Sequence, residues 1–431
     1  MRKTIHILTI ALIAFWFVPC CTLKAQDIQK HLSTDTTTFI QKHLDKKSDG
    51  LPLLKKVKVA GYIQTQVEVG GKDATLKTGA NNGKYSQSRD GDHSNFMRYG
   101  IRRGRIKVNY EDKIVSGLLE VEVLEGGLKQ RNAYVQINEP FLGMFSLRTG
   151  LFVIFLGDEV CPPPSDFEGI ELSMLSQKLF PEVKDVGAQL VFNGKKNTIL
   201  EGFRAHAGLL SGSSLSKDDD SRLNFAAYLK YTHDFARSSF GLGASFYNGT
   251  TNNSDTLLYK MSNGAWSAQS VLPNQKNRRR YYGIDAQYSF LNPLGQTNLR
   301  AEYMLGTQPS VQGDLKSPVG NTYLDSISFN HSRAFAGGYL YLSHYIAGTP
   351  LALLLQYSYL DGNTKMKSSH ATSPADLVYQ SWGLGGIWCI EHDLTLIAMY
   401  NINKNETSPF VDGYHKDRND NVFTLRLQYK F

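Results

Sequence analysis

Basic side chains recur at every second position in several short segments of this 431-residue sequence. Arg103, Arg105 and Lys107 are the clearest example. Side chains alternate between the two sides of an extended strand, so these three cations would form a row on one face. Arg and Lys along a narrow aqueous passage favour anions. The basic positions that we predict to line such a passage are Lys58, Arg103, Arg105, Lys107, Arg148, Arg204, Arg222, Lys230, Arg300 and Arg426.

Acidic residues on the same predicted faces could cancel this effect. They are Glu120, Glu122, Asp285 and Glu302. If the basic residues pair with these carboxylates, the row hydrates the passage without selecting anions. An anion-conducting ladder and a set of structural ion pairs are both compatible with the sequence.

The elements that would position these side chains are strands with one apolar and one largely polar face. In the last eleven residues, Phe423, Leu425, Leu427, Tyr429 and Phe431 alternate with Val422, Thr424, Arg426, Gln428 and Lys430. Outer-membrane barrels have this layout, with lipid outside, water inside and aromatic girdles at both interfaces. The alternation begins near Val57, and short turns alternate with long polar connections. The sequence therefore predicts an all-β fold, a transmembrane antiparallel β-barrel of about 16 strands, which is wide enough for an aqueous channel.

One long connection interrupts this pattern. The segment from Phe155 to Asp185 contains three consecutive prolines and an amphipathic stretch from Ile170 to Leu179. A connection of this length is usually functional or disordered, and this one is too apolar for easy disorder. We expect it to fold into the lumen and to constrict the channel. Its acidic residues are Asp158, Glu159, Asp166, Glu168 and Glu171.

The N-terminal segment has the features of an export signal. Arg2 and Lys3 precede an apolar run, which is followed by the small residue Ala25. This order is typical of a secretory signal peptide. We predict a signal peptide over residues 1–25 with cleavage near Ala25, a polar periplasmic lead-in over 26–54 and a barrel over 55–431 in the bacterial outer membrane. No later segment has the 18 consecutive apolar residues that suggest a helical span.

Composition and motifs argue against several other functions. The formal net charge is +8. Nucleic-acid binding needs basic residues gathered on one face, which this mild surplus does not indicate, so no nucleic-acid partner is predicted. The 11 His lack paired metal-ligand spacing, and neither a metal nor another cofactor is predicted. No nucleophile-elbow or phosphate-binding motif is present, so we do not expect an enzyme. The spacing of Cys161 and Cys389 does not decide whether they pair.

Four stretches resemble the phosphate-selective porin O and P family of outer-membrane porins. They are I-R-R-G-R-I-K-V at 101–108, R-N-A-Y-V-Q-I-N at 131–138, L-R-T-G-L-F-V-I-F-L-G at 147–157, and E-L-S-M-L-S-Q-K-L-F-P-E-V-K-D-V-G-A-Q-L at 171–190. The resemblance implies a 16-stranded trimeric porin with an inward third loop near 155–185, and often a preference for anions. Phe431 matches the terminal aromatic residue that the outer-membrane assembly machinery recognises. The acidic loop departs from the basic constriction of the family's best-known members, so phosphate selectivity does not carry over directly.

The sequence thus predicts an outer-membrane porin for passive diffusion of small hydrophilic solutes, with an anion preference if the basic ladder is effective. Its expected partners are membrane lipid, small hydrophilic or anionic solutes, the assembly machinery and two further copies in a homotrimer. Two other functions are compatible with a barrel. One is a surface binding or adhesion barrel that uses its long loops. The other is a barrel enzyme with Ser, His and a carboxylate at one rim.

Overall fold

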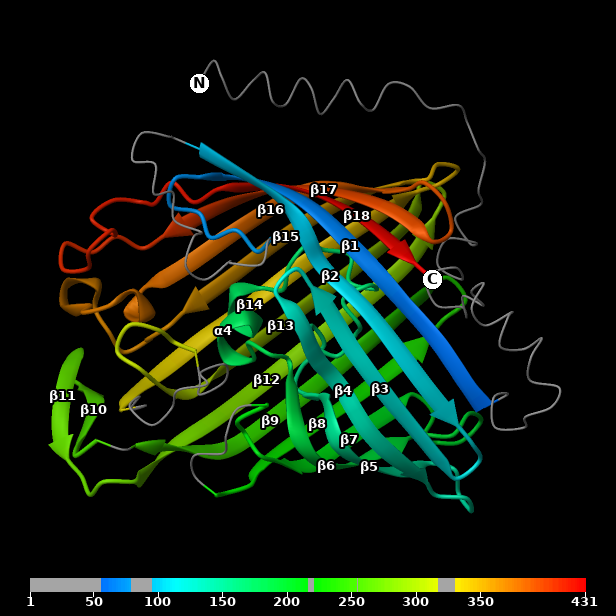
Figure 1. Cartoon of the computed structure of the whole chain (residues 1–431), viewed down its shortest axis with the longest axis horizontal. Helices are drawn as coiled ribbons and strands as arrows, with labels where there is room; N and C mark the ends of the chain where they lie inside the picture. The colour runs from blue at the N-terminus through cyan, green and yellow to red at the C-terminus, as the bar shows by residue number, and fades with distance from the viewer. Residues whose placement is uncertain (1–55, 79–94, 216–220, 254, 317–329) are drawn as a thin grey trace.

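The structure is a computed structural model that describes residues 56–78, 95–215, 221–253, 255–316 and 330–431 (Figure 1). The predicted signal peptide with its cleavage site, the predicted lead-in and residue 55 lie outside the described residues. No helix in the described ranges is long and apolar enough to cross a bilayer.

Sixteen antiparallel strands form a closed barrel wall, as predicted. Each strand pairs with the next along the chain, except that β12 follows β9 in the wall. Strand β1 pairs with both β2 and β18, which closes the sheet. The wall strands are β1 (Val57–Gly71), β2 (Asn95–Glu111), β3 (Val115–Leu124), β4 (Gly127–Asn138), β5 (Phe145–Val153), β6 (Lys184–Asn193), β7 (Phe203–Leu210), β8 (Asn224–Asp234), β9 (Ser238–Asn253), β12 (Gln275–Asn292), β13 (Gly295–Ser310), β14 (His331–Ile346), β15 (Leu351–Asp361), β16 (Val378–Cys389), β17 (Leu394–Asn405) and β18 (Val422–Lys430).

The two remaining strands form a separate hairpin. Strands β10 (Leu257–Ser262) and β11 (Ala265–Ser270) pair with each other in the connection between β9 and β12. The hairpin projects from one end of the barrel, on the left of Figure 1. A short parallel ladder joins Tyr259 and Lys260 to the start of β14.

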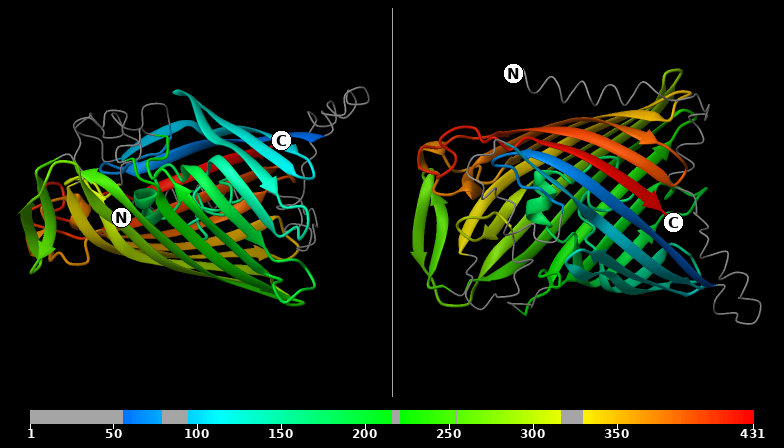
Figure 2. Two further views of the ribbon diagram at one scale, coloured as in Figure 1. Left: turned by 90° about the horizontal axis from the view of Figure 1, so that it is seen from below. Right: turned by 45° about the horizontal axis from the view of Figure 1, so that its top comes forward.

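The connections differ in length at the two ends of the barrel. The turns from β2 to β3, β8 to β9, β12 to β13 and β14 to β15 contain at most four residues. Most connections at the opposite end are longer, and this end carries the β10–β11 hairpin, on the left of both views in Figure 2. We call the two ends the short-turn end and the long-loop end. Phe431 lies at the short-turn end, where its backbone N–H and C=O both bond to Gly61 of β1.

Side chains in the wall follow the predicted alternation. In β1, Gln64 and Gln66 are buried, whereas Ile63 between them is exposed. In β18, Arg426 is buried and Leu427 is exposed. Polar groups therefore point into the barrel and apolar groups point outward, which is the arrangement of a barrel in lipid.

Two β-bulges break this alternation, and each turns an arginine inward. The register between β1 and β2 shifts after Gln64, so Arg102 has no cross-strand partner. The register between β3 and β4 shifts after Glu120, so Arg131 also has no cross-strand partner on β3. A bulge inserts one extra residue and re-aims the neighbouring side chains. Arg102 and Arg131 both line the interior cavity, although strict alternation would place them outside.

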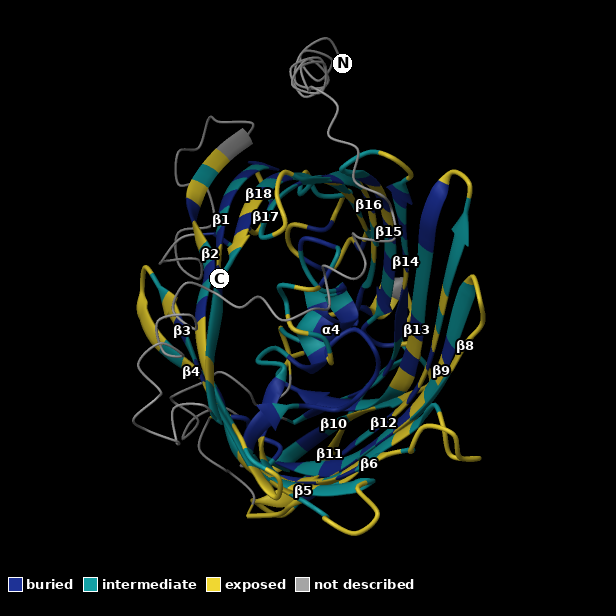
Figure 3. Ribbon diagram, turned by 90° about the vertical axis from the view of Figure 1, so that its right-hand side faces the viewer, coloured by how far each residue is buried: buried dark blue, intermediate teal, exposed yellow. Residues whose placement is uncertain are grey.

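The connection from β5 to β6 contains the helix α4 (Met174–Leu179). Figure 3 shows α4 within the ring of strands. The Ser173 hydroxyl accepts a hydrogen bond from the backbone N–H of Ser176 and caps the helix at its N-terminus. We call residues 154–183 the inner segment.

Candidate functional site

A cavity of about 1470 Å³ lies inside the barrel. Along β1, its lining extends from Lys58 near the short-turn end to Glu68, and then to Lys77 beyond the strand. The cavity therefore follows most of the length of the wall. Among the described residues, thirteen Lys or Arg and eleven Asp or Glu line it, so its surface is rich in charged groups.

The inner segment divides the interior into two unlike sides. The cavity lies between this segment and the wall formed by β1–β5 and β15–β18, which we call the open side. The opposite wall, formed by β7–β9 and β12–β14, is the packed side. Among the described residues, Tyr341 is the only lining residue that these packed-side strands supply.

Apolar side chains fill the packed side. Leu175 and Leu179 of α4 are almost fully buried in one cluster with Tyr281 and Phe335 of the wall. Phe180 adds an edge-to-face contact with Tyr281 at a centroid separation of 5.9 Å. Buried side chains therefore occupy the space between the inner segment and the wall here.

Asp158 fastens the inner segment to the packed side. Its carboxylate accepts hydrogen bonds from Lys230 Nζ at 2.5 Å and from Arg300 Nε at 2.8 Å. Burial favours a higher pKa for Asp158, but attraction to Arg300 and Lys230 holds the pKa below its usual value. The contact therefore consists of one carboxylate shared by two cations from β8 and β13.

Glu159 is a second anchor, and it is almost fully buried. Its carboxylate accepts hydrogen bonds from the Ser173 backbone N–H and hydroxyl, both at 2.6 Å. The hydroxyls of Ser176 and Tyr341 also donate to it. Glu159 thus ties the start of α4 to β14 through hydrogen bonds alone.

Glu302 of β13 binds the backbone of the same segment. Its Oε2 atom accepts hydrogen bonds from the N–H groups of Asp158 at 3.0 Å and Glu159 at 3.2 Å, and from the Tyr339 hydroxyl at 3.1 Å. The adjacent Gly157 has φ +78°, and a Cβ there would lie 1.9 Å from Glu302 Oε1. Only glycine fits this close approach.

Asp166 and Glu168 also have partners in the wall. Asp166 accepts a hydrogen bond from Lys430 Nζ of β18 at 2.8 Å. Glu168 accepts one from Asn298 Nδ2 at 3.2 Å and one from the Tyr345 hydroxyl at 3.4 Å. The side chain of Asp166 is 39% exposed, so its ion pair is less buried than those of Asp158.

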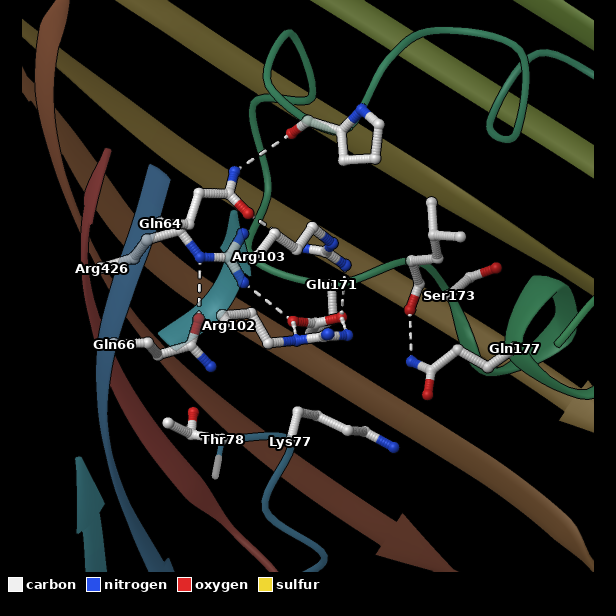
Figure 4. Close-up of polar contacts among 12 residues, drawn as sticks. Gln64, Gln66, Lys77, Thr78, Arg102, Arg103, Glu171, Ser173, Gln177 and Arg426 are labelled. Atoms are coloured by element: carbon white, nitrogen blue, oxygen red, sulfur yellow. Dashed lines mark hydrogen bonds and ion pairs between the residues drawn. The ribbon is translucent and has the colours of Figure 1, made fainter. Parts of the chain in front are cut away.

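Glu171 lies among three arginines on the open side (Figure 4). Arg102 donates through Nε at 2.7 Å and Nη2 at 2.8 Å, one to each carboxylate oxygen. Arg103 donates through Nη2 at 3.2 Å, and Arg426 through Nη2 at 2.8 Å. Burial favours a higher pKa for Glu171, but these three cations hold the pKa well below its usual range. All five acidic residues of the predicted constriction therefore have polar partners.

Six of the ten predicted basic positions form ion pairs. These pairs join Lys58 to Glu111, Arg103 and Arg426 to Glu171, Arg105 to Glu122, and Lys230 and Arg300 to Asp158. The predicted rungs Arg103 and Arg105 both belong to this set. At Arg103 and Arg105, the structure therefore has structural ion pairs and not free cations.

The other four basic positions differ in their surroundings. Lys107 and Arg148 line the cavity, and neither forms an ion pair among the described residues. Arg148 bonds to Gln136 Oε1 and lies 4.4 Å from the centroid of the Tyr134 ring. Arg204 in β7 and Arg222 just before β8 are exposed and lie outside the cavity lining.

Sequence reasoning missed Arg102 and Arg131 because alternation places them outside. Gly104 lies two residues after Arg102, and a glycine within a strand often marks a bulge, so a weak signal was present there. The sequence next to Arg131 carries no such signal. Arg131 donates to Glu122 at 2.7 Å and to Glu182 at 3.2 Å, which ties the end of the inner segment to β3.

The remaining candidates for chemistry are few. Cys161 and Cys389 are both free thiols. The described ranges contain no group of three or more His, Cys, Asp or Glu side chains arranged to hold a metal ion.

Comparison with known proteins shows the fold. The sequence matches no protein-family model and no curated protein. The outer membrane channel DcaP of Acinetobacter baumannii is 18% identical with a TM-score of 0.53, over 87% of this chain and 97% of that chain. The anion-selective porin from Comamonas acidovorans is 12% identical with a TM-score of 0.54, over 87% and 99%. Salmonella typhi OmpF, solved with daunomycin, is 11% identical with a TM-score of 0.53, over 87% and 97%.

This protein therefore has the fold of outer-membrane porins. The finer resemblance to the phosphate-selective O and P family stays a prediction.

Proposed function

We propose that this protein is an outer-membrane porin through which small hydrophilic solutes diffuse passively, with a preference for anions. The observation that carries the proposal is the long polar cavity inside a closed barrel whose outer face is apolar. Polar side chains and water replace the hydration that a solute would lose in lipid. The inner segment leaves room for solutes only on the open side, so it limits their size.

The anion preference rests on the distribution of charge along this path. The carboxylates Asp158, Asp166 and Glu171 of the inner segment are each compensated by basic groups of the wall. Lys107 and Arg148 line the cavity without a carboxylate partner among the described residues. Among the other acidic lining residues, basic groups pair with Glu111, Glu120, Glu182 and Asp314, and hydrogen-bond donors enclose Glu159. The remaining four, Glu68, Asp73, Asp393 and Asp420, lie near strand ends or in connections. Lys107 and Arg148 both lie close to the short-turn end of their strands. This part of the path therefore carries a positive surplus, and such groups favour anions in a narrow passage.

Planar-bilayer recording of the purified, refolded protein tests this function. We expect stepwise conductance in KCl, and a zero-current potential in a KCl gradient with the sign of a chloride-preferring channel. A potential of the opposite sign would contradict the anion preference. A folded barrel that gives no conductance would contradict the porin function and leave adhesion or enzymatic activity to be tested.

The proposal also includes export and assembly. A signal peptide over residues 1–25 would direct export, Phe431 would serve as the assembly signal, and the working unit would be a homotrimer in the bacterial outer membrane. This part rests on the resemblance and on the N-terminal sequence. Sequencing the mature N-terminus tests the first step, and Gln26 is the expected first residue.

A further inference from the structure

We propose that Glu171 is a tethered counter-ion in a binding site for solutes that carry carboxylates, and that these solutes exchange with it as they cross the channel. The site consists of the guanidinium groups of Arg102, Arg103 and Arg426. This inference rests on the proposed porin function and names the solute class that the channel would favour.

The geometry of the bound carboxylate defines what the site accepts. Arg102 presents Nε and Nη2 to the two oxygens of Glu171 at 2.7 and 2.8 Å, which is the side-by-side geometry that arginine forms with planar carboxylates. Arg103 and Arg426 supply one further hydrogen bond each. A solute carboxylate in the position of Glu171 could make the same four bonds.

The charge of the site leaves it able to attract another anion. Three guanidinium groups share a single carboxylate. Glu122 pairs with Arg105 at 2.8 Å, so among the described residues the one further carboxylate near the site is that of Glu68, which accepts the backbone N–H groups of residues 77 and 78 at 2.8 Å. The three guanidinium groups still outnumber the carboxylates of Glu171 and Glu68. Positive charge therefore exceeds negative charge within the site itself.

The wall holds two of the arginines in place independently of Glu171. Arg103 Nη1 donates to Gln64 Oε1 at 3.0 Å, and Arg426 Nε donates to Gln66 Oε1 at 2.8 Å. All three arginines belong to paired wall strands, whereas Glu171 belongs to the inner segment. If Glu171 moves away, Arg103 and Arg426 keep these braces.

The site is also accessible from the cavity. The side chains of Arg102 and Glu171 are 21% and 19% exposed, and both residues line the cavity. Arg426 is 1% exposed and forms the base of the site. Glu159 provides the contrast, because its carboxylate is enclosed by hydroxyl and N–H donors and has no cation to offer to a solute.

A simpler role for Glu171 would be to fasten the inner segment to the wall. Bilayer recordings of wild type and Glu171→Gln separate the two roles. Succinate is titrated into the KCl bath and the loss of chloride current is measured, with uncharged succinamide and inorganic phosphate as parallel probes. Asp112→Asn is the matched control, since Asp112 pairs with Lys56 and lies outside the cavity lining.

We expect succinate to reduce the wild-type current and succinamide to leave it unchanged. In Glu171→Gln, half-inhibition should need about tenfold less succinate. The uncharged side chain of this variant competes less well for the three arginines, and a factor of ten corresponds to about 1.4 kcal/mol of binding free energy. Asp112→Asn should behave like wild type. Arg102→Gln should weaken the inhibition several-fold, and it keeps the site testable if Glu171→Gln does not fold.

Three results would overturn the inference. Equal succinate sensitivity in Glu171→Gln and Asp112→Asn, with normal conductance in both, would reduce Glu171 to a fastening role and leave the porin function intact. Inhibition by phosphate without inhibition by succinate would exclude carboxylates as the preferred class. An absence of conductance in folded wild type would remove the porin function and this inference together.

Discussion

The two sides of the inner segment face walls of the same barrel, yet they differ in chemistry. On the packed side, Leu175 and Leu179 meet buried aromatic residues such as Tyr281, and Asp158 is enclosed by two cations. On the open side, the wall presents Arg and Lys side chains to a cavity. Both walls alternate polar and apolar positions, so the strand pattern alone does not distinguish them.

The difference shows what places the open cavity within this barrel. Apolar and aromatic side chains that point inward provide a surface for the inner segment to pack against. Inward charged side chains need water or counter-ions. On the packed side, Lys230 and Arg300 share the carboxylate of Asp158, whereas on the open side Lys107 faces the cavity. The position of the cavity therefore follows from which wall the inner segment packs against.

The largest effect is expected at the Asp158 anchor of the packed side. Asp158→Ala leaves Lys230 and Arg300 without their carboxylate in a poorly hydrated setting. Breaking a buried pair in this way costs about 3–5 kcal/mol. We expect a corresponding loss in the free energy of unfolding, measured by denaturant titration in detergent, together with larger and noisier single-channel currents.

Asp166→Ala is the matched change on the open side. Asp166 is 39% exposed and pairs with a single lysine, Lys430. Exposed pairs contribute about 0–1 kcal/mol, so this variant should stay close to wild type. Equal losses in the two variants would contradict the distinction between the sides.

A somewhat smaller effect is expected from Leu175→Ala in α4. Leu175 is 1% exposed, and removing a buried leucine side chain costs about 2–5 kcal/mol. The inner segment should become more sensitive to protease in detergent. Ile199→Ala, at a position that is 95% exposed in the turn before β7, should have no such effect.

On the open side, a change of charge should alter selectivity and spare stability. Lys107→Gln removes a lining cation that has no carboxylate partner among the described residues. We expect the chloride-to-potassium permeability ratio to fall by about twofold, measured from zero-current potentials. Lys113→Gln in the turn after β2 makes the same charge change outside the cavity lining and should leave the ratio unchanged.

The smallest effect concerns acid. The pKa of Glu171 is lowered well below its usual range, so its contribution to folding is present above the ordinary pKa of about 4.3 and is lost only when the pH falls through the lowered value. Glu171 should therefore stay charged at pH 4. The difference in succinate sensitivity between wild type and Glu171→Gln, scaled to the dianion present, should persist at that pH. Its disappearance near pH 4.3 would show that Glu171 titrates normally.

The fold was largely predictable because a two-residue period depends only on local sequence. The alternation that continues through Leu427 and Tyr429 predicted a barrel of about 16 strands with an apolar exterior. The structure confirms both features. The β10–β11 hairpin was missed, because its segment reads as part of a long polar connection.

The site was less predictable because its contacts join distant parts of the chain. Arg300 and Asp158 are 142 positions apart, and no local pattern specifies that they meet. The bulge at Arg102 changes which face this residue occupies, and it creates the three-arginine cluster around Glu171. Alternation predicted that Arg103 and Arg426 face inward, and both side chains are buried in the structure, but it gave no information on which carboxylates would pair with them.

The most direct test of the account asks which side of the inner segment conducts solutes. Single cysteines are introduced at Lys107 on the open side and at Tyr228 on the packed side, in a background with Cys161 and Cys389 changed to serine. A negatively charged methanethiosulfonate is then added during bilayer recording. The account predicts that current through Lys107→Cys falls until a reducing agent restores it, while current through Tyr228→Cys does not change. Loss of current in Tyr228→Cys with no change in Lys107→Cys would place the path on the packed side and contradict the account.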